Sequence, residues 1–246
     1  MDNSITANRV VTAWRDLLGN DLPKQLVGAV AALEAVSYAE APLMPFDASA
    51  VTPGKAEALV TEHAERLATI NHWKDAKSQA LNAAGNRVLV TAGEVLPDVL
   101  AQIQPRLIAA SEALAAALEL LPDHNPTPEV LVSAGPSALE AFQSAQAAIA
   151  ELDALDRFAA SMGAIFGHQG EVALRLLTVT TREDFQTILR AKDKQGSLRP
   201  LWVTAVTTPG VVFTINTPAQ SKEIRRVLDS LPPTEHKKPV FLKLGA

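Results

Sequence analysis

Apolar residues recur every three to four positions through most of the first 165 residues, and this spacing constrains the fold more than any other feature. It places apolar side chains on one face of an α-helix. The intervening sequence is rich in alanine, the strongest helix former. We therefore predict an N-terminal all-helical domain of antiparallel helices over residues 1–165. Its clearest stripe, over residues 137–162, consists of Leu139, Phe142, Ile149, Leu152, Leu155, Phe158 and Met162.

The other predicted helices of this domain are bounded by proline and glycine. They cover residues 4–18, 26–38, 55–83 and 88–120. Gly85 predicts a break or kink between the last two, and prolines predict further breaks near 96–98 and 104, because proline removes a helix hydrogen bond. The helix over 55–83 has its apolar positions at Leu59, Val60, Leu67, Ile70, Trp73 and Leu81.

A proline-containing loop or arm at residues 41–53 carries three large apolar residues, Leu43, Met44 and Phe46. Two interpretations of these residues stay open. They pack onto the helical domain of their own chain, or they form a docking arm for another subunit, since exposed apolar groups often mark partner contacts.

The sequence pattern changes after Gly163, Gly167 and Gly170. Alternating or β-branched apolar runs predict strands at residues 171–179, 201–207, 211–216 and 240–244. Helices are predicted after Thr181, where a capping-box pattern ends at Asp184, and after Pro218. The order β-α-β-β-α-β is that of a ferredoxin-like domain. The predicted fold class is thus α+β, with the helical domain followed by a small ferredoxin-like domain over residues 171–246.

Charge divides the chain at a similar place. Residues 1–165 hold 10 Lys and Arg against 20 Asp and Glu, whereas residues 166–246 hold 12 against 7. On the C-terminal side, Lys222, Arg225 and Arg226 lie on the last predicted helix, with Lys237 and Lys238 in the following loop. These cations are either an ordinary solvated surface or a contact for an acidic partner such as nucleic acid.

A search for catalytic or cofactor-binding patterns is negative. The chain has no cysteine, which excludes disulfides, zinc–thiolate sites and thiol catalysis. His63 and His72 are nine residues apart and therefore lie on opposite faces of their helix. The glycines at 163–170 precede a predicted strand and lack the following Lys-Ser/Thr, so they match neither a dinucleotide fingerprint nor a phosphate loop. We expect no cofactor and no metal.

These observations favour a non-enzymatic structural or interaction protein that forms a subunit of a larger assembly, for example a bacteriophage head or tail accessory component. Expected partners are other protein subunits, including copies of this chain. A nucleic-acid or regulatory binding module is the first alternative, and an enzyme with an inter-domain cleft near His168 is the second. The N-terminus lacks a signal-peptide pattern and no apolar run is long enough for a membrane span, so we expect a protein in the cytoplasm, or in a virion assembled there, without membrane contact. The predicted partner-binding residues are Leu43, Met44, Phe46, Lys222, Arg225, Arg226, Lys237 and Lys238.

Overall fold

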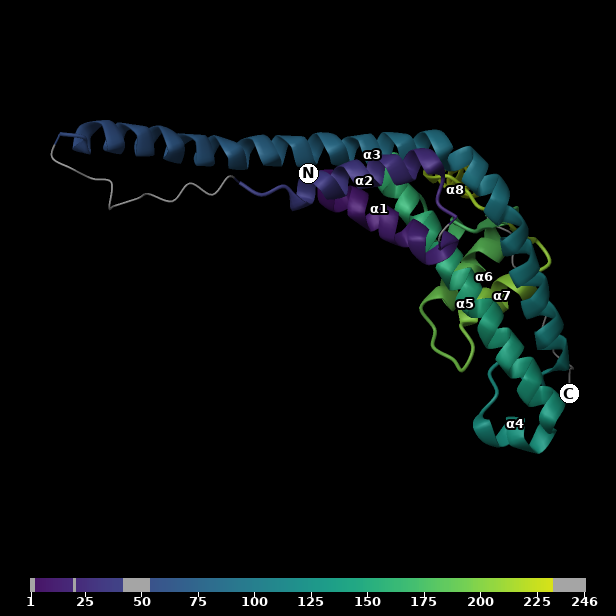
Figure 1. Ribbon diagram of the computed structural model, residues 1–246. Helices are drawn as coiled ribbons and strands as arrows, with labels where there is room; N and C mark the ends of the chain where they lie inside the picture. Colours follow the sequence, from purple (N-terminus) through teal and green to yellow (C-terminus); the bar gives the residue numbers. More distant parts are fainter. Residues whose placement is uncertain (1–2, 20, 42–53, 232–246) are drawn as a thin grey trace, which may run out of the picture. The chain divides into compact units, whose positions relative to one another are not determined.

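The computed structural model describes residues 3–19, 21–41 and 54–231, except for the side chain of Asn71. Helices dominate these ranges (Figure 1). The chain divides into two compact units, residues 1–97 and residues 98–246, and each is described by itself.

The first unit contains α1 (Asn3–Leu18), α2 (Lys24–Tyr38) and the beginning of α3 (Ala56–Leu120). α1 and α2 confirm the helices predicted at 4–18 and 26–38. Both helices bury most of their large apolar residues, whereas Ile5 on α1 and Val27 on α2 are exposed. Arg15 on α1 pairs with Glu34 on α2 at 3.2 Å. The core of this unit includes Val10, Trp14, Leu26, Val30, Leu33, Val88, Ala92 and Leu96.

The helix α3 runs without interruption through Gly85, Pro97 and Pro105, so the breaks predicted there are wrong. A proline inside a helix costs about 3 kcal/mol, but apolar residues on both sides of each proline are buried and hold the helix together. Both proline rings lie on the exposed side. Gly85 has a packing role, because a Cβ atom there would lie 2.6 Å from backbone atoms of Asn3.

The second unit contains the rest of α3 and five further helices, with one small sheet. The helices are α4 (Pro128–Ala134), α5 (Pro136–Ile165), α6 (Arg182–Lys192), α7 (Pro200–Thr207) and α8 (Pro218–Ser230). A 3-10 turn, η2 (Val172–Leu174), precedes β1 (Leu177–Val179), which pairs antiparallel with β2 (Val211–Phe213). Leu177 lies opposite Phe213 and Val179 opposite Val211. The structure confirms the predicted helices at 137–162, after Thr181 and after Pro218.

The ferredoxin-like prediction is wrong. Within the described residues the sheet has only two strands. Residues 201–207, predicted as a strand, form the helix α7. The strands predicted at 171–179 and 211–216 shrink to three residues each, and the one predicted at 240–244 lies outside the described residues.

Tertiary contacts explain why the β-branched run at 201–207 is helical. Pro200 occupies the first turn of α7, where its fixed φ favours a helix. Leu201, Trp202 and Ala205 are buried at helical spacing, and α7 packs against α6. The resulting burial outweighs a strand preference that depends mainly on packing context.

A side chain from α3 occupies the outer edge of β2 and stops the sheet from growing there. Gln104 Nε2 donates to the carbonyl of Phe213 at 3.2 Å, and Gln104 Oε1 accepts from the backbone N–H of Ile215 at 3.1 Å. On the other edge, Thr214 and Asn216 donate their backbone N–H groups to Leu176 and Arg175. The amide of Gln104 therefore satisfies the groups that another strand would pair with.

Candidate interaction surface

The first part of α3 extends past the ends of the two helices that pack on it. Lys77 Nζ donates to the carbonyls of Ser37 and Ala39 at the end of α2, at 2.8 and 2.6 Å. The backbone N–H of Asn3, at the start of α1, donates to Asn82 Oδ1 at 3.0 Å. The stretch before these contacts, residues 56–73, spans about five helical turns and about 27 Å. We call it the projecting segment; Figure 1 shows it running beyond α1 and α2.

The projecting segment carries an apolar stripe. Leu59, Val60, Leu67, Ile70 and Trp73 lie within about 140° of the helix circumference. Val60 and Leu67 are 62% and 49% exposed, whereas Leu59, Ile70 and Trp73 are partly buried. Val88 and Ala92 continue the same stripe in the later turns of α3, where both are fully buried. The projecting segment thus presents an exposed extension of a face that forms core elsewhere in the same unit.

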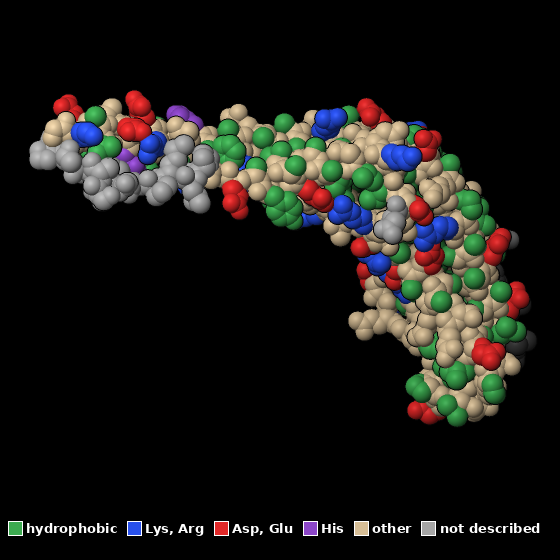
Figure 2. Space-filling view, viewed as in Figure 1, with side chains coloured by type: hydrophobic (Ala, Val, Ile, Leu, Met, Phe, Trp, Pro, Cys, Tyr) green, Lys and Arg blue, Asp and Glu red, His purple; other side chains and the backbone are tan. Residues whose placement is uncertain are grey.

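Charged residues interrupt the stripe at its middle. Glu62 and Arg66 form an ion pair one helical turn apart, and both side chains are about half exposed. Glu57 and Glu65 lie on the exposed side of the helix. In Figure 2 this stretch, at the left of the view, shows hydrophobic side chains between acidic and basic ones. The sequence analysis identified these apolar positions but assigned them no partner role, because only the structure shows where α1 and α2 end along α3.

The predicted basic surface on α8 is largely neutralised by neighbouring carboxylates. Arg225 Nε donates to Asp229 at 2.8 Å, and its guanidinium lies 4.9 Å from the ring centroid of Phe185. Arg226 makes two hydrogen bonds to Glu223, at 2.8 and 2.6 Å. These bonds raise the pKa of both guanidinium groups, and the bond from Arg226 lowers the pKa of Glu223.

The other predicted partner-binding residues are placed as follows. Lys222 is exposed on α8. Leu43, Met44, Phe46, Lys237 and Lys238 lie outside the described residues. The structure therefore brings together three of the predicted cations on one helix, and two of these three pair with acids of the same helix.

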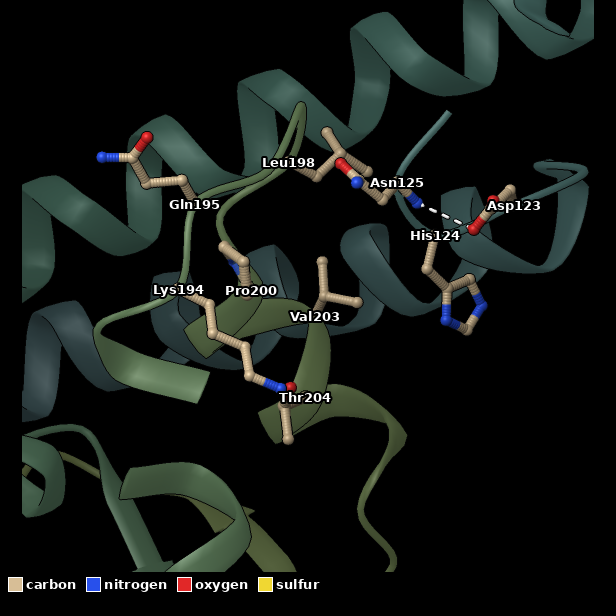
Figure 3. A pocket seen from close by; sticks show the side chains of 9 residues that line it. All are labelled: Asp123, His124, Asn125, Lys194, Gln195, Leu198, Pro200, Val203 and Thr204. Carbon is tan, nitrogen blue, oxygen red and sulfur yellow. Dashed lines mark hydrogen bonds between the residues drawn. The ribbon is translucent and has the colours of Figure 1, made fainter. Parts of the chain in front are cut away.

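Two cavities in the second unit adjoin His124 in the loop between α3 and α4. One has a volume of about 240 Å³, and the other, of about 170 Å³, is lined in part by Glu119 and Thr207. Figure 3 shows the larger one, with Lys194 extending toward Thr204 and His124 on a different wall. Most of the polar side chains that line it are exposed, including Asp123, which accepts a hydrogen bond from the backbone of Asn125 at 3.0 Å. The lining offers scattered polar groups rather than a nucleophile held against a base.

His168 is exposed in the loop after α5, and its ring centroid lies 6.5 Å from that of Phe166. Gly167 adopts a positive φ of 71° directly after the helix. This left-handed conformation is typical of a residue that ends a helix. Gly163, by contrast, lies inside α5 and is buried.

Searches of the described residues for a metal site and a membrane-spanning helix were negative, as were searches for related proteins. Among the residues that the structure describes, no three His, Asp or Glu side chains gather as metal ligands. None of the helices in those ranges combines the length and the apolar character needed to cross a membrane. No family model, curated protein or solved structure matches the chain.

Proposed function

We propose that this chain is a non-enzymatic structural or interaction protein, a subunit of a larger assembly, and that the projecting segment of α3 is its contact surface. The observation that carries the proposal is the exposure of Val60 and Leu67 on a stripe whose continuation at Val88 and Ala92 is buried. A bacteriophage head or tail accessory component is one kind of subunit that fits this proposal.

Helix energetics support a contact role for the projecting segment. Most of the stability of helices in proteins comes from packing of an apolar face rather than from intrinsic helix propensity. Each Å² of apolar surface removed from water contributes about 25 cal/mol. A partner that covers the stripe would therefore stabilise the segment as well as bind it.

The ion pairs on α8 count against the nucleic-acid alternative. Arg225 and Arg226 would have to exchange Asp229 and Glu223 for phosphate before they released counterions from nucleic acid. Binding through these two arginines would therefore be weakened by competition from carboxylates of the same helix.

The proposal is tested by isolating the tagged chain from its native host with nuclease treatment at two salt concentrations. We expect a complex of fixed stoichiometry that survives both nuclease and moderate salt. A Val60→Glu, Leu67→Glu double variant should lose it, while Thr61→Glu, on the opposite exposed side of the same helix, should keep it. A complex that dissolves with nuclease would favour the nucleic-acid alternative, and a chain that emerges alone would contradict the proposal.

A further inference from the structure

We propose that the projecting segment binds the same segment of a second copy of this chain, as an antiparallel helix pair. This inference rests on the proposed function and names the partner of the same surface. It follows from the order of large, small and charged residues along residues 56–73, which is complementary to itself when reversed.

The segment has the spacing of a short heptad pattern. Ala56, His63 and Ile70 form one row at seven-residue intervals, and Leu59, Arg66 and Trp73 form the other. Such rows define the seam of a helix pair. In an antiparallel pair, each residue of one row faces a residue of the other row.

One register places every residue of the seam against a suitable neighbour. With Leu59 opposite Ile70 of the second copy, Ala56 lies opposite Trp73, which sets the smallest side chain of the seam against the largest. Both ends of the pair are then apolar layers, because two-fold symmetry repeats each contact. Val60 and Leu67, the exposed large apolar residues of the segment, lie beside the seam, whose own positions are partly exposed, and they extend the buried area.

Charge complementarity at the centre favours this register. Arg66 lies opposite His63 of the second copy, one residue from that copy's Glu62. Within one chain Arg66 already pairs with Glu62. In the pair, two arginines and two glutamates would alternate around the centre, so each arginine gains a second carboxylate. A shifted register would set Arg66 against an apolar residue, which is costly in a desolvated seam.

This self-complementarity is the reason for choosing a second copy over an unrelated protein. A heterologous partner would need only an apolar groove and would not explain why Ala56 matches Trp73 and Glu62 matches Arg66 at the same spacing. A two-fold contact also closes on itself and yields a dimer rather than an open chain of copies.

The first experiment measures the mass of the purified full-length chain by sedimentation equilibrium over a concentration series. We expect a dimer of twice the 26.1 kDa chain mass. Ile70→Glu, which puts a charge in the seam, should give a monomer that keeps most of its helix content by circular dichroism. Thr61→Glu, on the opposite side of the helix, should remain dimeric. A monomeric wild-type chain, or a dimer that persists in Ile70→Glu, would overturn the proposal.

The second experiment tests the register with two charge reversals. Arg66→Glu and Glu62→Arg each break the ion pair within the chain and bring like charges together across the dimer, so each alone should dimerise at least about tenfold more weakly. An equimolar mixture of the two variants should recover dimerisation. In the mixed dimer one chain has glutamate at positions 62 and 66 and the other has arginine at both, so opposite charges meet across the contact. A mixture that stays as weak as its components overturns this pairing.

These outcomes are distinct from a failure of the proposed function. A monomeric purified chain that still emerges from its host in a complex of fixed stoichiometry would overturn self-pairing and leave the assembly role standing. A dimer that emerges from its host without other components would support self-pairing and contradict a role in a larger assembly.

Discussion

The indole Nε1 of Trp202 donates a hydrogen bond of 2.6 Å to Oδ1 of Asp153, joining α7 to α5 across 49 positions of sequence. Asp153 also pairs with Arg199, whose guanidinium lies 5.7 Å from the centroid of the Trp202 ring. Trp202 itself is almost fully buried. This cluster holds the start of α7 and orients a helix whose local sequence favours a strand.

We therefore expect Trp202→Phe to lower the free energy of unfolding by about 1–3 kcal/mol, because it removes the hydrogen bond to a charged acceptor while keeping most of the apolar bulk. Urea denaturation followed by far-ultraviolet circular dichroism measures the change. A double-mutant cycle with Asp153→Ala isolates the contact. The double variant should lose less stability than the sum of the losses in the two single variants. Additive losses would show that the hydrogen bond contributes nothing to stability.

The same cluster explains where sequence reasoning about the fold succeeded and failed. The helix at 137–162 and the N-cap of α6 are local signals, and both are confirmed; Asp184 N–H donates to Thr181 Oγ1 at 3.1 Å. Of the predicted stripe, Leu139 is exposed and Phe142 partly buried, whereas its residues from Ile149 to Met162 are buried. The run at 201–207 is short and β-branched, so its local preference is ambiguous. A hydrogen bond to Asp153 on a distant helix is a tertiary contact that no local pattern predicts.

The candidate surface was predictable only in part, for a related reason. The apolar positions of the projecting segment follow from helical periodicity. Their exposure depends on where α1 and α2 end along α3, which is set by contacts such as those of Lys77 with the end of α2. The positions of Arg225 and Arg226 were likewise predictable, whereas periodicity and net charge did not reveal that each pairs with an acid three or four residues away.

Asn216 is a second buried polar contact with a measurable role. Its side-chain Nδ2 donates to the carbonyls of Leu174 and Leu177 at 2.8 and 3.0 Å, and the residue is 5% exposed. Asn216→Leu would leave these buried carbonyls without that donor, at a cost of about 1–3 kcal/mol for an unsatisfied buried group. Chemical denaturation should show this loss, while Asn86→Leu, at an exposed position on α3, should change stability little. Equal effects of the two substitutions would contradict the structural role of Asn216.

Asp156 predicts a dependence of stability on pH. Burial raises the pKa of this carboxyl above its ordinary value of 3.8, and attraction to Arg175, 3.9 Å away, only partly opposes the shift. The folded state therefore binds the proton more tightly than the unfolded state does. The stabilisation from this group is fully present below pH 3.8 and is lost as the pH rises through the folded-state pKa.

The test compares Asp156→Asn with the wild type by urea denaturation at a series of pH values from the ordinary pKa of aspartate upward. The neutral amide does not titrate, so the stability of the variant relative to the wild type should increase with pH across this window and then level off. A constant difference would show that Asp156 has the same pKa in the folded and unfolded states.

Two glycines inside helices of the first unit should respond in opposite directions to the same substitution. At Gly85 a Cβ atom would lie 2.6 Å from the backbone of Asn3 and Ser4, so alanine would force α1 away from α3. Overpacking of this kind typically costs about 1–3 kcal/mol and outweighs the gain in helix propensity. At Gly28 on α2 nothing lies within 4 Å of the added atom, so alanine should stabilise the chain by about 0.5–1 kcal/mol. Thermal denaturation of the two variants should move the midpoint down for Gly85→Ala and up for Gly28→Ala. Because both changes add one methyl group to a helix interior, a shift in the same direction would mean that α1 does not cross α3 closely at Gly85.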